Sequence, residues 1–295
     1  MFPIIPAASA AESGNKEGIF AYGTVDAGKL SMSNLVSNTG VVAADVTGVG
    51  TARNQVAGCE YGGNKGIFGY GVTPTKVSMT NLVTNAGVVG ADVTGVGTVR
   101  GEVAACNYGG DRDKGIFGFG NLGPGAVVTN LVNLVTNEGV VGTDVTGVGT
   151  SRRGLAACEF GGDQGIFGFG GYPVLSMTNL VTNAGVVGAD VTGVGTARYF
   201  LAACSYGEDK GIFGYGSPSM TNLVSNVGVV ASDVAHAGSN NSSLAACEFG
   251  GDQGIFGYGG GSVSHTNLVT DEGVVGTDVT GVGTGRYQLA ACSFN

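Results

Sequence analysis

The sequence predicts an all-β fold, a six-bladed β-propeller with four-stranded blades, from two repeated motifs and their spacing. Successive cysteines lie about 47 residues apart on average, which suits a propeller blade. The tripeptide Gly-Ile-Phe begins at Gly18, Gly66, Gly115, Gly165, Gly211 and Gly254, and a cysteine after small apolar residues recurs at Cys59, Cys106, Cys158, Cys204, Cys247 and Cys292.

The composition agrees with a compact β-protein. Glycine is abundant, with 58 residues, but it follows no Gly-X-Y period, which excludes collagen. Hydrophobic residues make up 43% and charged residues 12%, the opposite of the balance in a disordered chain. Val, Ile, Phe, Tyr and Thr fill the runs between glycines and favour strands. No apolar run approaches the length of a membrane span, so we expect no membrane insertion.

Each unit divides into four expected strands. In the unit from Arg152 to Gly193, we expect strands over 155–160, 165–170, 175–182 and 186–192. A Gly-Gly-Asp-Gln turn joins the first two, and a variable loop joins the second to the third. The turn Asn183-Ala-Gly185 joins the last two and recurs in all six units, five times with Asn and once with Asp. Asn or Asp starts such a turn, and Gly supplies the positive φ that a bulged hairpin needs.

The chain ends predict a closed ring. The sequence opens on a Gly-Ile-Phe half-unit and closes on a cysteine half-unit. We therefore expect the C-terminal strand, 287–294, to complete the first blade beside 18–23, 30–37 and 41–47. Residues 18–295 then form one propeller domain, and residues 1–17 an N-terminal arm. The arm lacks a basic residue near its start, so a secretory signal is not expected.

The order of an Arg, a small apolar strand, a Gly-rich turn and a Gly-Ile-Phe-Gly-Tyr-Gly strand resembles a kelch repeat. The Arg position is held by Arg53, Arg100, Arg152 or Arg153, Arg198 and Arg286. The kelch Trp is missing, the double Gly has become Gly-Tyr-Gly or Gly-Phe-Gly, and the fifth unit departs over 234–241. The resemblance implies the fold but no partner or activity. The repeats are also similar, more weakly, to uncharacterised repeat proteins of tailed-phage virions.

The six cysteines are interpreted as small buried residues where blades converge. One thiol per unit cannot form a disulfide framework, because bonded cysteines need Cα atoms within about 7 Å. No CxxC or His spacing supports a thiol-bound metal, and we expect no metal or other cofactor. Free cysteines indicate synthesis in a reducing cytoplasm.

Two sets of polar residues recur once in each unit. An Asp in the fourth strand is expected to accept backbone N–H bonds in the following turn and to pair with the next Arg, at Asp45, Asp92, Asp144, Asp190, Asp233 and Asp278. The residues after the cysteines should ring one mouth of the channel, either around a cation or, as we favour, as solvated strand ends: Glu60, Asn107, Glu159, Ser205, Glu248 and Ser293.

No catalytic residue is expected. Only two histidines are present, which excludes a multi-histidine copper or zinc site, and no Gly-x-Ser-x-Gly elbow with an assigned His occurs. A residue repeated in every blade is a poor catalytic candidate, since a catalytic group is normally unique. The chain is therefore interpreted as a non-enzyme.

The loop between the second and third strands differs from unit to unit, and four of the six prolines lie in these loops. Proline stiffens a loop and lowers the entropy lost on binding. We expect all six loops on one face of the disc. Their candidate binding residues are Lys29, Pro74, Lys76, Pro124, Tyr172, Pro173, Pro218 and His265.

These observations favour a structural or binding module, tail- or capsid-associated in a virion or part of another surface assembly, that contacts a protein partner or receptor. The alternative is a glycan-binding adhesin that stacks loop aromatics such as Tyr172 on sugars. The formal charge of −9 argues against a nucleic-acid partner, which needs a basic face.

Overall fold

The computed structural model describes residues 15–124 and 127–294 and contains small antiparallel sheets. Six sheets have three strands each, and β2 (Thr24–Val25) pairs only with β3 (Gly28–Lys29). Among these described residues, a single 3-10 turn, Gly110–Arg112, lies between two strands. From the channel outward the sheets are β20 (Ala290–Phe294), β1 (Glu17–Ala21), β4 (Ser33–Val36); β5 (Ala57–Tyr61), β6 (Lys65–Gly69), β7 (Thr80–Val83); β8 (Ala104–Tyr108), β9 (Lys114–Gly118), β10 (Val132–Val135); β11 (Ala156–Phe160), β12 (Gln164–Gly168), β13 (Thr178–Val181); β14 (Ala202–Tyr206), β15 (Lys210–Tyr215), β16 (Met220–Val224); and β17 (Ala245–Phe249), β18 (Gln253–Gly257), β19 (Thr266–Val269).

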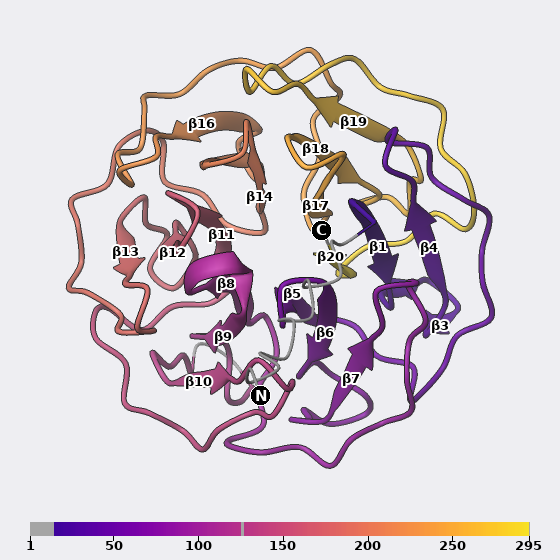
Figure 1. Cartoon of the computed structure of the whole chain (residues 1–295), viewed down its shortest axis with the longest axis horizontal. Coiled ribbons are helices and arrows are strands. Elements are labelled where there is room, and N and C mark those ends of the chain that lie inside the picture. The colour runs from indigo at the N-terminus through magenta and orange to yellow at the C-terminus, as the bar shows by residue number, and fades with distance from the viewer. Residues whose placement is uncertain (1–14, 125–126, 295) are drawn as a thin grey trace, which may run out of the picture.

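The six sheets surround a central axis (Figure 1). Each of the innermost strands β20, β5, β8, β11, β14 and β17 contacts the next, and β17 contacts β20, so the contacts close on themselves. The C-terminal strand β20 pairs with β1 from the other end of the chain, with Cys292 opposite Ile19. The all-β class and the predicted pairing of the two chain ends are confirmed.

The Gly-Ile-Phe motif forms the middle strand of each sheet. In β12, Ile166 lies between Cys158 and Leu180 in the register. Both Ile166 and Phe167 are fully buried, because neighbouring sheets cover both faces of this strand. Phe167 meets Phe119 of the preceding sheet edge to face, with ring centroids 5.2 Å apart. Adjacent residues of a strand point to opposite faces of the sheet, so a sheet with one solvated face would expose either Ile166 or Phe167. Here both are buried, because both faces of the sheet are covered.

The expected fourth strand is not a full strand. It touches the third strand only through isolated bridges, such as Val181 with Val187 and Thr178 with Val191. Two residues separate the bridges on β13, but three separate them on the outer segment. This extra residue is a β-bulge, which interrupts the ladder. The same offset occurs in all six sheets, so the prediction of four-stranded sheets is wrong as to the outermost strand.

The two faces of the molecule differ in the connections that they carry. One, the turn face, carries the turns after the innermost and third strands, and the two kinds of turn touch: Asn183 Nδ2 donates to Asp163 Oδ2 at 3.1 Å. The other, the loop face, carries the variable loops, and four of these are bridged to residues that enter a sheet, as Gly171 is to Arg153. Of the residues that the structure describes, none belong to a helix that could span a membrane.

The cysteines lie between sheets. All six are free and buried, as predicted. A Cβ added to Gly165 would lie 2.6 Å from Cys106 Sγ, and each Gly of a Gly-Ile-Phe motif meets a cysteine of the preceding sheet in this way. The thiol fills the space that the missing side chain leaves. Burial raises the pKa of Cys59 to about 12, so these thiols stay protonated and unreactive at neutral pH.

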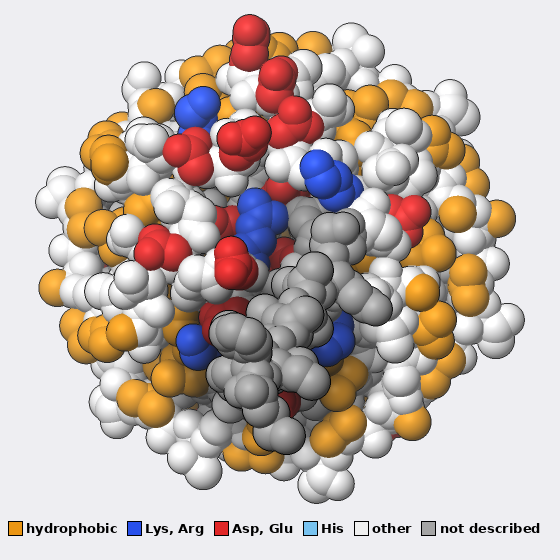
Figure 2. Space-filling view, in the orientation of Figure 1, with side chains coloured by type: hydrophobic (Ala, Val, Ile, Leu, Met, Phe, Trp, Pro, Cys, Tyr) orange, Lys and Arg blue, Asp and Glu red, His pale blue; other side chains and the backbone are white. Residues whose placement is uncertain are grey.

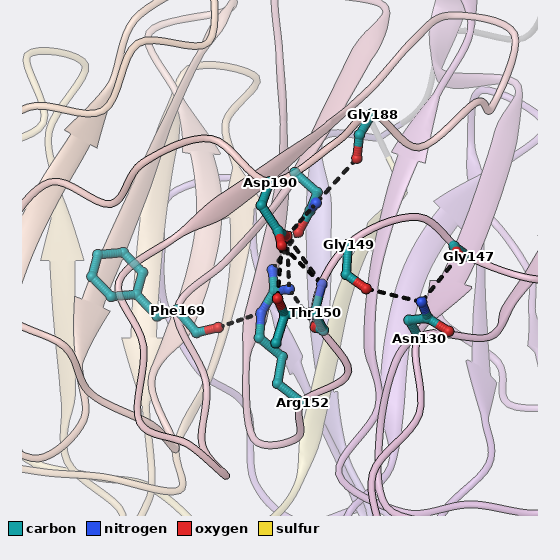
Figure 3. A network of polar contacts seen from close by, with 9 residues as sticks. Asn130, Gly147, Gly149, Thr150, Arg152, Phe169, Gly188 and Asp190 are labelled. Carbon is teal, nitrogen blue, oxygen red and sulfur yellow. Dashed lines mark hydrogen bonds and ion pairs between the residues drawn. The ribbon is translucent and has the colours of Figure 1, made fainter.

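An arginine joins each pair of neighbouring sheets at five of the six junctions. The guanidinium of Arg152 lies 4.4 Å from the ring centroid of Phe119 in the preceding sheet. Its Nε donates to Phe169 O at 2.7 Å and its Nη2 to Asn179 Oδ1 at 2.7 Å, both in the sheet that it enters (Figure 3). Equivalent stacking is made, with guanidinium-to-ring distances of 4.1–4.3 Å, by Arg53, Arg100, Arg198 and Arg286.

The recurring Asp belongs to the same junction. Asp190 accepts hydrogen bonds from Thr150 N and Thr150 Oγ1 and lies 3.9 Å from Arg152 Nη1 (Figure 3). An ion pair is therefore present, but the expected partner is wrong: Asp190 pairs with the arginine that enters its own sheet, whereas the next arginine, Arg198, pairs with Asp233. The expected donor is wrong, because Thr150 lies in the connection that enters the sheet, 40 residues before Asp190, and not in the turn after it. The Asp thus fixes the incoming chain. Of the two candidates for the repeated arginine in this unit, Arg152 and Arg153, Arg152 makes the junction contacts.

Candidate functional site

The six polar residues after the cysteines gather at one mouth of the central channel, on the turn face. They line a single cavity together with the cysteines and the Gly or Ala that precedes each cysteine. Glu60, Glu159 and Glu248 are each no more than 3% exposed. The prediction of solvated strand ends is therefore wrong for these glutamates, because the channel is too narrow to hydrate them freely.

An arginine that the sequence analysis did not single out fills this mouth. Arg112 extends from the Gly110–Arg112 turn, with Nη1 2.8 Å from Glu248 Oε2 and Nε 3.0 Å from Glu159 Oε2. Its Nη1 also lies 3.8 Å from Glu60 Oε2. One guanidinium thus faces three carboxylates. A signal was available in the sequence, since the turn between Tyr108 and Lys114 is two residues longer than the corresponding turns.

This arrangement changes the acidity of the buried groups. Burial raises the pKa of Glu159 to about 7, helped by repulsion from Glu248 and opposed by attraction to Arg112. Burial also raises the pKa of Glu248, against the same attraction. The three carboxylates in turn hold the pKa of Arg112 above its usual value, despite its own burial. The mouth is therefore closed by one guanidinium and three buried carboxylates, of which Glu159 titrates near neutral pH.

Within 15–124 and 127–294, no three His, Cys, Asp or Glu side chains are grouped to hold a metal ion. The cation at the acidic mouth is instead the guanidinium of Arg112.

The opposite mouth, on the loop face, is built from backbone. Six residues with positive φ surround it, each two residues beyond the position of a junction arginine: Gln55, Glu102, Gly154, Phe200, Ser243 and Gln288. Their amides and carbonyls form five head-to-tail hydrogen bonds around the axis, as Phe200 N donates to Gly154 O at 2.7 Å. Only one of the six is glycine, so the hydrogen bonds stabilise a backbone conformation that side chains normally disfavour. Next to them, six aliphatic side chains line the same mouth: Val56, Val103, Leu155, Leu201, Leu244 and Leu289.

Tyr172 is the loop residue best placed for recognition. It is 50% exposed, and the guanidinium of Arg153 lies 4.0 Å from its ring centroid. Arg153 Nη1 is also 3.3 Å from Glu102 Oε1 at the channel mouth. This row of three side chains runs from a variable loop to the axis. It occurs at one junction only, because an arginine follows the junction arginine only in this unit.

The other predicted loop residues are spread around the loop face. Lys29 Nζ donates to the carbonyl of Thr73 and so ties two neighbouring loops. Pro74, Pro124, Pro173 and Pro218 are exposed at loop tips, whereas Lys76 and His265 are half-buried. The structure does not bring these residues into one pocket. Residues 125–126 of the third loop lie outside the described residues, as does most of the predicted arm 1–17.

The fifth unit leaves a hollow on the loop face. Here Asn241 stands where the other junctions have arginine, and its Nδ2 donates to Tyr258 O at 2.5 Å. The hollow, of about 340 Å³, is lined by short polar residues that include Ser219, Asn240 and Ser242. Ser219 Oγ is 2.9 Å from His236 Nε2. The departure of the fifth unit from the repeat therefore replaces a buried arginine junction with a polar hollow on the loop face.

No protein-family model matches the chain, and a search of curated proteins finds no significant match.

Proposed function

We propose that the chain is a six-bladed, kelch-like β-propeller and a non-enzymatic structural or binding module. It would serve as a tail- or capsid-associated subunit of a virion, or in another surface assembly, and contact a protein partner or receptor through the loop face. The virion context rests on the resemblance of its repeats to phage virion proteins, and the kelch assignment on the order of its motifs.

The observation that carries the proposal is the contrast between repeated junctions and variable loops. Five junctions repeat the same buried arginine, stacked on an aromatic ring and bonded to the next sheet. The loops are where the units differ most, and four of them are held against the entry to a sheet, as Val72 is bridged to Asn54. A rigid scaffold with variable loops on one face is the usual arrangement of a binding module.

The proposal is tested by locating the protein and then altering one face at a time. Antibody labelling and mass spectrometry of purified particles should find the chain as a stoichiometric subunit. Lysine at exposed Pro74 and Pro173 on the loop face should then reduce incorporation, while lysine at exposed Thr39 and Ala184 on the turn face should not. Absence from any assembly, or equal effects of the two pairs, would contradict the proposal.

A glycan-binding adhesin is the second candidate, favoured by the half-exposed ring of Tyr172 beside Arg153. Aromatic rings offer the flat apolar surface on which a sugar stacks, and the guanidinium suits an acidic sugar. Binding on a glycan array should disappear with Tyr172→Ala and survive Tyr172→Phe, which keeps the ring. No binding by the unaltered protein would remove this candidate.

A further inference from the structure

We infer that the outer rim of the disc is a self-association surface through which copies of this chain pack edge to edge. The rim consists of the bulged outer segments 41–49, 88–96, 140–148, 186–194, 229–237 and 274–282. The inference rests on the proposed structural role and deepens it by naming a partner, a second copy of the chain.

Exposed valines recur at the same positions in every rim segment. The first valine of each is more than half exposed: Val41 65%, Val88 61%, Val140 58%, Val186 61%, Val229 64% and Val274 58%. A second valine, five residues later, is nearly half exposed in each segment, from Val46 at 49% to Val279 at 48%. Hydrophobic side chains accordingly lie along the periphery of the disc (Figure 2). Contiguous exposed apolar surface marks an interaction site, whereas single scattered side chains do not, and here the valines recur at equivalent positions in all six segments.

The rim also lacks the residues that usually protect a sheet edge. None of the six segments contains Lys, Arg, Glu or Pro. Their only charged residue is the recurring Asp, whose carboxylate is already bonded inside the molecule, as Asp92 is by Thr51 and Asn81. Edge strands are normally guarded by lysine, proline or a bulge, and here only the bulge is present. The bulge opposes strand-to-strand hydrogen bonding but leaves the valine side chains free to pack.

The identical valines of the six segments point to a second copy as the occupant, and the distribution of charge confines the contact between copies to the rim. The chain is acidic, with a formal charge of −9, and many of its acidic side chains lie on the turn face (Figure 2). These include Asp111, Asp113, Asp163, Glu208, Asp209, Asp252, Asp271 and Glu272. Two copies would repel one another if these faces met. A contact at the rim keeps these acidic faces apart, and because all six segments present the same valines, any two edges can place apolar side chains against each other.

We expect each contact between two rim segments to be weak, and the association to become stronger when one copy makes several such contacts. A contact between single rim segments buries only a few valines on each copy, well below the roughly 800 Å² per partner of a standard interface. Six equivalent edges allow several such contacts at once, so a sheet-like array gains avidity without a new contact. The purified chain should therefore shift from monomer to larger species as its concentration rises.

Sedimentation velocity of the full chain over a concentration series tests the inference, with matched triple variants. Val41→Lys, Val88→Lys and Val186→Lys together place three charges on the rim and should keep the protein monomeric. Thr39→Lys, Ala86→Lys and Ala184→Lys add the same charge at exposed positions two residues earlier, in the turns. This control should associate at least as well as the unaltered chain, because it lowers the net negative charge.

Two outcomes overturn the inference. One is an unaltered chain that stays monomeric up to about 1 mM, the weak limit of specific association. The other is equal loss of association in the rim and turn variants. If the lysines disturb folding, Val→Thr at the same rim positions keeps the shape and should still lower association several-fold. Failure of this test leaves loop-face binding intact, because that is measured on particles with loop variants.

Discussion

The imidazole of His236 lies over the ring of Tyr215, with centroids 4.3 Å apart, where a guanidinium lies at the other five junctions. Burial lowers the pKa of His236, so the imidazole is neutral at physiological pH. Asp278, which faces this junction, keeps its bonds to Ser239 and Asn267 but has no arginine partner among the described residues. The junction between the fifth and sixth sheets therefore lacks the cation that joins the others.

Restoring that cation should stabilise the fold. The double change Asn241→Arg and His236→Gly recreates the pattern of the other units. It should raise the free energy of unfolding by about 1–2 kcal/mol, from stacking on Tyr215 and bonds to Asn267 and the Tyr258 carbonyl. Thermal unfolding should show a higher Tm, whereas His236→Gly with Asn240→Arg, at an exposed neighbour, should not. An unchanged or lower Tm for the restored pair would mean that the fifth unit is already optimised.

Removing a junction arginine should be costly, and the adjacent arginine provides a control. Arg152→Met leaves the acceptors Phe169 O and Asn179 Oδ1 buried without their donor. The expected loss is about 3–5 kcal/mol, typical of breaking a buried charged network. Arg153→Met removes one ion pair, with Glu102, from a side chain that is 16% exposed and leaves the bonds between the two sheets in place, so it should cost less than Arg152→Met. Denaturant titration of both variants would contradict this account if the two losses were equal.

The contact between glycine and cysteine predicts a compensating pair. Gly165→Ala would place a methyl group 2.6 Å from Cys106 Sγ, which the packed interface cannot accept without movement. The single change should cost about 1–3 kcal/mol. Adding Cys106→Ala removes the sulfur and should recover part of that loss. Equilibrium unfolding of the four members of this cycle measures the coupling; additive effects would show that the contact does not decide the cost.

The buried carboxylates at the turn-face mouth predict a pH-dependent stability. Because the pKa of Glu159 is raised to about 7 in the fold, from about 4.3 unfolded, the folded state binds a proton more tightly. Its stabilising contribution is fully present below pH 4.3 and is lost as the pH rises toward 7, over a range on the order of 1–3 kcal/mol.

Glu159→Gln should remove most of this dependence between pH 4.3 and 7, since its amide does not titrate. Glu138→Gln, at an exposed turn position, is the control and should keep the profile of the unaltered chain. Urea unfolding at several pH values gives the comparison. A profile that remains as steep in the Glu159 variant would assign the titration to Glu248 or another buried group.

The sequence by itself determined the features that depend on local repetition. Gly-Ile-Phe and the cysteine motif located the two inner strands of every sheet, because alternation and turn residues specify strands over short distances. The split unit at the chain ends predicted that β20 would pair with β1. The burial of the cysteines as free thiols also followed from the presence of one thiol in each unit.

Only the tertiary structure decided what depends on contacts between units. The bulge that limits the fourth strand needs the register of two segments, and the pairing of Asp190 with Thr150 joins residues 40 positions apart. Arg112 reaches three glutamates from three different sheets, a meeting that no local pattern encodes. A repeated sequence specifies what each unit is, but closing the units around an axis determines which side chains are buried together and therefore which charges must be paired.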